Sequence, residues 1–434
     1  MPAYLAASAA LRLATAVGVA TSLAVPAWAG PLTLAEAQRI AVERSTQLVA
    51  RQASATSARE MAVAAAQLPD PVLKLQVNNL PVDGADAFSL TRDFMTMRSV
   101  GVMQEITRAE KREANAARLE READKSAAER LADVATIRRD SALAWLDRYY
   151  AEAMQAVLDE QRRIAQTEID AADSAYRGGR GSLTDVLGAR AALVALDDRA
   201  SDTRRRIGTA RIALARFIGD EAQSPLAGRP AIDELPLDAR SVDADILHHP
   251  QLTVLDRREA VAAAEVKAAQ AARKPDWTVE VMYSVRGSAY SNMVSVGVSV
   301  PLPWDRAHRQ DREVAARLAM LDEVRAERED MRRAHAAEVR AMLEEWRVGR
   351  ERSRRYAREL VPLAAERTEA TLAAYRGAKA SIADVLAAHR NEIDVRTQAL
   401  QLEWDAARAW AQLNFLDVND DALREPGRAA GNAQ

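Results

Sequence analysis

Apolar and polar residues alternate in two short stretches in each half of the chain. Residues 72–80 read VLKLQVNNL and residues 277–285 read WTVEVMYSV, with apolar side chains at every second position. Residues 98–106 (RSVGVMQEI) and 293–303 (MVSVGVSVPLP) repeat the alternation. Because successive side chains of a strand point to opposite faces, this period of two predicts four β-strands.

Long stretches without glycine or proline follow the paired strands. Residues 102–177 contain neither residue type, and a helix over most of that run would be about 100 Å long. Residues 304–361 form a second run, interrupted only by Gly349, and Pro362 is expected to kink or break it. A further helical run covers about 383–417. Because a globular domain has no room for helices of this length, the pattern favours extended helical hairpins.

Apolar residues within the long helices follow the spacing of a coiled-coil seam. One series is spaced by four, three, four and seven residues: Leu146, Tyr150, Ala153, Val157 and Ile164. A second recurs every seven residues: Val186, Leu193, Ala200, Ile207 and Leu214. These narrow stripes predict that each long helix packs lengthwise against another helix.

A short polar turn occurs twice between the helical runs. Residues 175–187 read AYRGGRGSLTDVL and residues 374–386 read AYRGAKASIADVL, with eight of thirteen letters identical at an offset of 199. The turns are rich in glycine, which favours a chain reversal between antiparallel helices. We call residues 177–185 tip 1 and residues 376–384 tip 2. Each half therefore reads helix, strand, loop, strand, long helix, tip, return helix.

Composition narrows the functions that this architecture can serve. The chain has 434 residues, a formal charge of −3 at pH 7, 48% hydrophobic residues and only 4% aromatic residues. Ala, Leu, Arg, Glu and Asp dominate, which is typical of long helices and coiled coils. Arginines are interleaved with Asp and Glu, so we expect solvated helix faces and no nucleic-acid partner. The absence of Cys excludes disulfides, Cys-ligated metal sites and a lipid-bearing Cys.

The first 29 residues have the pattern of an export signal. A single charge, Arg12, precedes an apolar stretch, and the letters AWA form a small-x-small cleavage site before Gly30. We expect a signal peptide over 1–29; an uncleaved anchor is the alternative. No other window approaches 18 continuous apolar residues, so a membrane-bound mature chain would have to cross with its strands.

The four predicted strands raise the question of how their edges are covered. Strands of about ten residues can cross a bilayer when tilted, but four are too few to close a barrel. Open edges are not tolerated in lipid, so several chains would have to pool their strands. The alternative is a small soluble sheet at the end of a coiled-coil stalk, and the pattern alone leaves both open.

The chain resembles the TolC-like outer-membrane efflux channels over nearly its whole mature length. The resemblance rests on LTLAEAQRIAVERSTQL at 32–48, both tip motifs, VSVGVSVPLPWDR at 294–306 and the internal repeat. It implies a mainly α fold with a small β part, in which two repeats of long antiparallel helical hairpins plus four transmembrane strands form a trimeric α-helical tunnel and a 12-stranded β-barrel. The implied domains are a first TolC-like repeat (30–219), a linker (220–245), a second repeat (246–420) and a flexible tail (421–434).

The resemblance also implies a function and partners. It implies the outer-membrane channel of a tripartite, RND-type efflux system: a homotrimer in outer-membrane lipid that extends into the periplasm. Its partners would be a periplasmic adaptor (membrane fusion protein) and an inner-membrane pump. Residues 88–106, FSLTRDFMTMRSVGVMQEI, look most like the heavy-metal (CzcC/CusC-like) branch, which implies export of heavy-metal cations. The alternatives are a drug-efflux or protein-secretion channel, or a periplasmic coiled-coil scaffold or adaptor.

No residue pattern indicates catalysis, a cofactor or a resident metal. The chain lacks HExxH, a phosphate loop, GxSxG and a Cys nucleophile, so we expect neither an enzyme nor a cofactor. Met95, Met97 and Met103 invite comparison with the thioether ligands of Cu(I), but packing in or beside a strand is the favoured interpretation. For the one adjacent histidine pair, His248-His249, a helix cap or packing is favoured over metal binding.

The tips hold the candidate functional residues. In a trimer, the resemblance implies six tips around one axis, where a ring of acids would favour cations. We expect the periplasmic gate to consist of Asp185, Asp384, Arg177, Arg180, Arg376 and Lys379. We expect the adaptor to dock on Gly178, Gly179, Gly181, Ser182, Gly377 and Ser381, because glycines permit close approach to the backbone. The alternative role for the two acids is an N-terminal capping box with the serines, and both roles can coexist.

Overall fold

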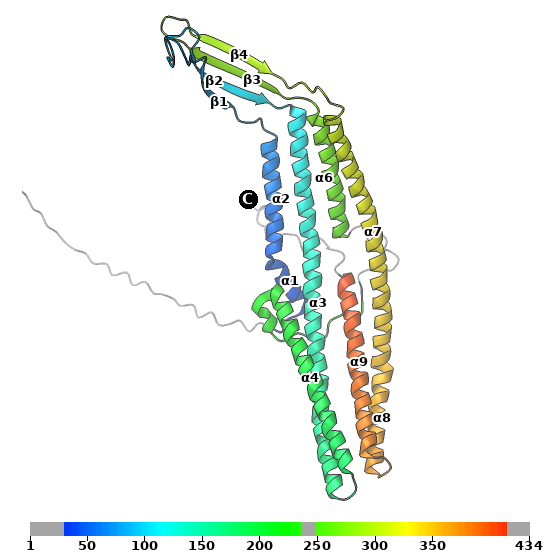
Figure 1. Cartoon of the computed structure of the whole chain (residues 1–434). Helices are drawn as coiled ribbons and strands as arrows, with labels where there is room; N and C mark the ends of the chain where they lie inside the picture. The colour runs from blue at the N-terminus through cyan, green and yellow to red at the C-terminus, as the bar shows by residue number, and fades with distance from the viewer. Residues whose placement is uncertain (1–29, 236–248, 415–434) are drawn as a thin grey trace, which may run out of the picture.

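The computed structural model shows an elongated molecule with a sheet at one end and two helical hairpins at the other (Figure 1). The structure describes residues 30–235 and 249–414. The expected signal peptide (1–29), most of the linker (236–245), His248 and the expected tail (421–434) lie outside the described residues. The boundaries of the two repeats therefore remain predictions.

The elements follow the predicted order in both halves. The first half contains α1 (Leu34–Glu43), α2 (Thr46–Ala65), β1 (Val72–Asn78), β2 (Met97–Ile106), α3 (Ala109–Arg177), α4 (Leu183–Ile218) and the short 3₁₀ helix η1 (Gly219–Gln223). The second half contains α6 (Pro250–Ala272), β3 (Trp277–Val285), β4 (Met293–Ser299), α7 (Gln310–Arg355), η2 (Tyr356–Leu360), α8 (Val361–Arg376) and α9 (Ile382–Asn414).

The four strands form one antiparallel sheet in the order β1-β2-β3-β4. The two halves of the chain meet inside this sheet, where β2 pairs with β3 and Val102 lies opposite Val281. One face is apolar and open to the surroundings, with Leu75 73% and Val296 70% exposed. The structure thus confirms the four strands and the alternation that predicted them.

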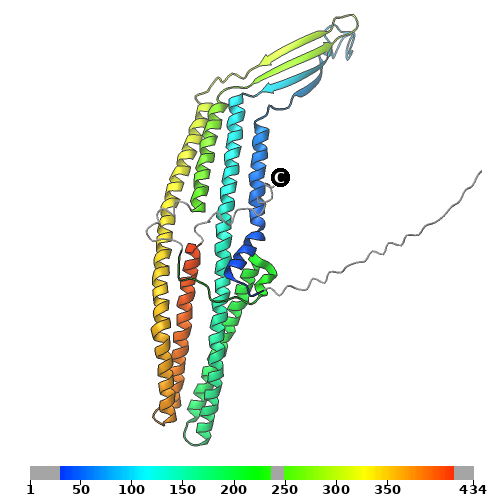
Figure 2. The same ribbon diagram turned by 180° about the vertical axis from the view of Figure 1, so that it is seen from behind.

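Helix α3 runs through the middle of the helical layer. It contacts α2, α4, α6 and α9, whereas α7 contacts α6 and α9 and lies at the outer edge (Figures 1 and 2). Two shorter helices lie end to end beside each long helix: α2 and α4 beside α3, and α6 and α9 beside α7. Among the helices of the described ranges, none is both long enough and apolar enough to span a membrane.

The largest core lies at mid-length, where the helices meet the segment that follows α4. Trp145 and Tyr150 of α3 are 1% exposed there. Three indole N–H groups donate to backbone carbonyls: Trp145 to Leu32 (3.1 Å), Trp346 to Ile232 (3.3 Å) and Trp410 to Glu234 (2.8 Å). These bonds satisfy carbonyls outside regular structure and attach both the residues before α1 and the segment after η1 to the helices.

Pro362 does not end the second long helix. Helix α7 continues into a single π-helical turn at Tyr356–Leu360, and α8 then runs to Arg376. Proline cannot donate to the carbonyl four residues earlier. Just before it, the amide of Val361 donates to the carbonyl of Tyr356, five residues back. This shift of the hydrogen-bond ladder accommodates the proline, so the expected break is a π-bulge instead.

The two predicted seams differ in accuracy. In α4 the seven-residue series is correct, because Val186, Ala200 and Leu214 are buried and the other two members are half-buried. In α3 the series begins correctly but then moves by one position: Val157 and Ile164 are only half-buried, and the buried residues are Leu158, Gln161, Ala165 and Ile169. The shift follows from the contacts of α3 with both α4 and α9, because two partners bury a wider stripe than one.

Candidate functional site

Tip 1 reverses the chain through a Schellman motif at the end of α3. The amide of Gly179 donates to the carbonyl of Tyr176 (3.0 Å), and the amide of Arg180 donates to that of Ala175 (2.9 Å). Gly179 has φ +68°, the left-handed conformation that the motif requires. Gly178 and Gly181 do not share it, so one of the three predicted glycines meets a backbone requirement for positive φ.

Tip 2 has the same motif with a different residue at its centre. The amide of Ala378 donates to the carbonyl of Tyr375 (3.0 Å), and the amide of Lys379 donates to that of Ala374 (2.8 Å). Ala378 has φ +55° and occupies the position of Gly179 in tip 1. Gly377, the predicted turn glycine, has φ −83° and serves only as the helix C-cap. The left-handed residue of tip 2 is therefore an alanine, which is strained there.

Both tips open their return helices with a reciprocal capping box. In tip 1, the amide of Asp185 donates to Ser182 Oγ (3.2 Å), while the amide and hydroxyl of Ser182 donate to Asp185 Oδ2 (3.0 and 2.8 Å). In tip 2, the amide of Asp384 donates to Ser381 Oγ (3.2 Å), and Ser381 donates to Asp384 Oδ2 (2.9 and 2.7 Å). The hydroxyl of Ser381, followed by its amide, holds the pKa of Asp384 below its usual value. The capping role predicted as the alternative is present in both tips.

The basic residues of the tips are exposed and do not bring the tips together. Arg177 pairs with Asp173 of its own helix (2.6 Å). Arg180, Arg376 and Lys379 are exposed. Across residues 30–235 and 249–414, no ion pair joins tip 1 to tip 2 within one chain. Each turn therefore holds its own share of the predicted gate and docking residues. Within one chain the two shares are not joined, so the predicted gate would have to form between neighbouring chains.

Behind the tips, the two hairpins pack against each other through a small apolar cluster. Ile169 and Ala172 of α3 and Val186 of α4 meet Ile382 and Val385 of α9, and all five are at most 9% exposed. Two ion pairs lie farther from the tips, from Arg199 to Asp394 (2.9 Å) and from Arg396 to Glu160 (3.1 Å). This seam fixes the position of tip 1 relative to tip 2.

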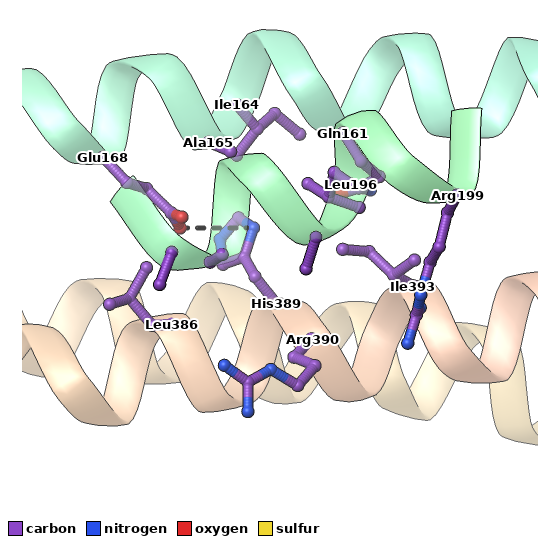
Figure 3. A pocket seen from close by; sticks show the side chains of 13 residues that line it. Gln161, Ile164, Ala165, Glu168, Leu196, Arg199, Leu386, His389, Arg390 and Ile393 are labelled. Atoms are coloured by element: carbon purple, nitrogen blue, oxygen red, sulfur yellow. Dashed lines mark ion pairs between the residues drawn. The ribbon is translucent and has the colours of Figure 1, made fainter. Parts of the chain in front are cut away.

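The seam also holds an acid–base pair that the sequence did not reveal. Glu168 of α3 and His389 of α9 face each other at 3.6 Å beside a cavity of about 390 Å³ (Figure 3). Burial raises the pKa of Glu168 to about 7 and lowers the pKa of His389 below its usual value. Neither Glu168 Oε1 nor His389 Nδ1 has a hydrogen-bond partner. The only sequence signal was a titratable residue on each of two helices expected to pack.

The histidine predicted to cap a helix does so. His249 Nδ1 accepts the amide N–H of Gln251 (3.3 Å) at the start of α6. Burial, with smaller contributions from His335 and Arg139, lowers the pKa of His249 to about 4. Because Nδ1 accepts, the neutral ring carries its proton on Nε2, which leaves no free nitrogen for a metal. The described residues contain no group of three or more His, Asp or Glu side chains arranged to hold a metal ion.

The second half of the chain matches a known family. Residues 243–417 match the family described as outer membrane efflux protein. Over these residues the chain is similar to outer membrane efflux proteins. No curated protein matches the chain. The match agrees with the expectation of an outer-membrane efflux protein.

Solved structures extend the likeness to the first half, and each match covers 88% or 89% of this chain. The outer membrane protein VceC from Vibrio cholerae is 19% identical with a TM-score of 0.72, and the match covers 88% of this chain and 95% of VceC. The outer-membrane channel OprN is 17% identical (TM-score 0.75; 88% and 89% covered). CusC, solved in a study of folding and transmembrane channel formation, is 15% identical (0.73; 89% and 92%). These likenesses confirm the TolC-like fold, mainly α with two hairpin repeats and four strands.

Proposed function

We propose that the protein is the outer-membrane channel of a tripartite efflux system and that it works as a homotrimer. The carrying observation is a fold like that of outer-membrane channels over 88% of the chain, together with the match of residues 243–417 to outer membrane efflux proteins. The exposed apolar face of the four-stranded sheet supports lipid contact. A homotrimer covers the edges of β1 and β4, because each edge pairs with the next chain.

The tips support the assignment of the adaptor side. They lie at the end of the molecule opposite the sheet (Figure 1). If the sheet sits in the outer membrane, the tips reach into the periplasm and present exposed backbone at Gly178, Gly179 and Gly377 to an adaptor. We propose these residues, with Gly181, Ser182 and Ser381, as the docking surface, and the charged residues of both tips as the gate.

Assembly and conduction test the channel directly. Native mass measurement of detergent-extracted protein is expected to give three copies, and planar-bilayer recording of the same sample is expected to give K⁺ currents. A soluble monomer or dimer without currents would instead support the periplasmic scaffold. Removal of the first 29 residues during export, checked by N-terminal sequencing, tests the expected signal peptide.

The gate has a sharper test, because Asn preserves the cap. In Asp185→Asn/Asp384→Asn, the side-chain oxygen can still accept from the serine amide, whereas the charge is lost. We expect a marked loss of cation preference and of block by divalent ions applied from the periplasmic side. The matched control is Asp170→Asn, an exposed acid two turns before tip 1. Unchanged selectivity in intact trimers of the double variant would leave the two acids with capping alone.

We propose heavy-metal cations as the exported cargo, in place of hydrophobic drugs or secreted proteins. The support is the resemblance of residues 88–106 to the heavy-metal branch. Deletion of the gene is expected to sensitise cells to soft metal ions more than to dyes and detergents. Sensitisation to dyes and detergents alone would assign the channel to drug efflux.

A further inference from the structure

Every methionine of the four strands lies on the polar face of the sheet. The register places Met97, Met103, Met282 and Met293 on the same face as Lys74, Gln76, Ser99, Glu280 and Ser284. The opposite face is built largely from Leu, Val, Ile, Trp and Tyr and contains no methionine. The apolar face is open to the surroundings, whereas Met282 on the polar face is 8% exposed. The favoured interpretation of Met97 and Met103 as packing residues stays a prediction, and it does not by itself require that every strand methionine share one face.

The register also spaces these four methionines evenly along the strands. Met97 begins β2 at the loop end of the sheet, and Met293 lies level with Ser99, because both pair with Ser284. Met282 pairs with Gly101, and Met103 is the next residue of β2 on the same face. The four levels therefore follow one another at steps of two residues, about 7 Å each in an antiparallel strand. Each level holds one thioether.

A hydrogen bond shows that this face is polar at the sulfur atom of Met282. Gln76 Nε2 donates to Met282 Sδ across β2 at 2.9 Å, so the thioether points toward polar side chains. Gly101 lies between them, and a Cβ there would come within 2.8 Å of the Val281 carbonyl. Nearby, Lys74 Nζ pairs with Glu280 Oε2 at 2.7 Å. The carboxylate in the middle of the face is therefore neutralised, which weakens its attraction for hard divalent cations.

We propose that Met97, Met293, Met282 and Met103, here called the methionine series, are successive contact points for a soft monovalent cation, Cu(I) or Ag(I), inside the channel. The inference rests on the proposed function, in which the polar face lines the conduction path. Thioethers bind Cu(I)-like ions and ignore hard cations such as K⁺. A single thioether per chain at each level holds the ion weakly, and conduction needs sites from which an ion can leave. A homotrimer presents three copies of each level.

Silver ion is the probe, because it is soft, monovalent and stable in air. The test variant is Met97→Leu/Met103→Leu/Met282→Leu/Met293→Leu, which keeps side-chain volume and removes the sulfur. The matched control is Met61→Leu/Met320→Leu/Met331→Leu, which removes three exposed thioethers from the helices. The full-length trimers are recorded in planar bilayers in potassium nitrate, and the Ag⁺ concentration that halves the K⁺ current is measured.

We expect the test variant to need at least tenfold more Ag⁺ than wild type, with unchanged K⁺ conductance, and the control to match wild type. Equal Ag⁺ sensitivity in the test variant and wild type overturns the proposal, as does wild type that does not respond to Ag⁺. An equal loss of Zn²⁺ sensitivity also overturns it, because softness would not be the cause. If wild type passes no K⁺ current, the proposed channel function itself has failed.

Discussion

The two helical hairpins share a sequence motif and a length but differ in how their long helices are held. Helix α3 is unbroken over 69 residues and has 20 buried residues, because helices pack on both of its sides. Helix α7 has four buried residues and passes through a π-bulge before α8. The two repeats therefore have a similar backbone path but differ in how their helices are packed. Helix α3 lies between other helices of the layer, whereas α7 lies at its edge.

The tips show the same contrast at the scale of single residues. Both form Schellman motifs followed by capping boxes, but the left-handed residue is Gly179 in tip 1 and Ala378 in tip 2. Burial near the tips differs too, because Glu168 of α3 lies in the seam, whereas Arg367, 199 positions later, is exposed on α8. Tip 2 thus combines a strained turn with a helix that has few buried contacts.

The largest expected effect comes from introducing a proline into α3 at the position that corresponds to Pro362. Arg163 of α3 corresponds to Pro362 and is exposed. Arg163→Pro removes a helix hydrogen bond in a helix held on two sides, so we expect a loss of about 3 kcal/mol in unfolding free energy. Denaturant unfolding followed by circular dichroism measures it, with Arg163→Ala as control. A loss below about 1 kcal/mol would mean that α3 can form a π-bulge as readily as α7–α8 does.

The seam should respond to pH through Glu168. Its pKa of about 7 in the folded chain lies above the unfolded value of 4.5, so the folded state binds the proton more tightly. Stability from this group is fully present below pH 4.5 and is lost as pH rises through 7, by at most about 3 kcal/mol. Glu168→Gln should therefore gain stability relative to wild type between pH 5 and 8. Melting curves at several pH values test this.

His389 acts in the opposite direction and serves as the internal control. Burial lowers its folded pKa below 6.5, so it destabilises the folded state as pH falls below that value. His389→Gln is expected to change the curves on the acid side, whereas Glu168→Gln changes them toward pH 8. If the melting temperatures of wild type and Glu168→Gln changed with pH in the same way, Glu168 would ionise at its ordinary pKa.

Substitutions at the two residues with positive φ, Gly179 and Ala378, should change stability in opposite directions. Gly179→Ala is expected to destabilise tip 1 by about 1–2 kcal/mol, because alanine is strained at positive φ. Ala378→Gly is expected to relieve that strain and stabilise tip 2 by up to about 1 kcal/mol. Amide hydrogen exchange at the ends of α3 and α8 reads out each tip separately. Changes of the same sign in both tips would contradict the comparison.

The smallest expected effect is the loss of a capping box, and it should be the same in both tips. Ser182→Ala and Ser381→Ala each remove a capping box with the same bonds, so each should cost about 1 kcal/mol. Hydrogen exchange in the first turns of α4 and α9 measures the loss. Ser182→Thr and Ser381→Thr, which keep the hydroxyl, are the controls. A difference of more than twofold between the tips would show that the caps are not equivalent.

The sequence by itself determined the elements and their order. Strand alternation, the long stretches without glycine or proline and the repeated turn gave four strands, two hairpins and two tips at nearly the observed residues. The capping boxes were also readable, because Ser and Asp three residues apart satisfy backbone groups of the same helix turn. Such features depend on residues close together in the sequence, so they can be predicted without knowledge of tertiary contacts.

Only the tertiary structure decided which helix faces are buried and which residues meet. The shifted seam of α3 follows from two partners instead of one, and the Glu168–His389 pair joins helices that are far apart in the chain. Likewise, alternation gave each strand two faces, but the register between strands placed Met97, Met293, Met282 and Met103 on one face at successive levels. Packing and register depend on contacts between distant segments, and a local pattern does not contain them.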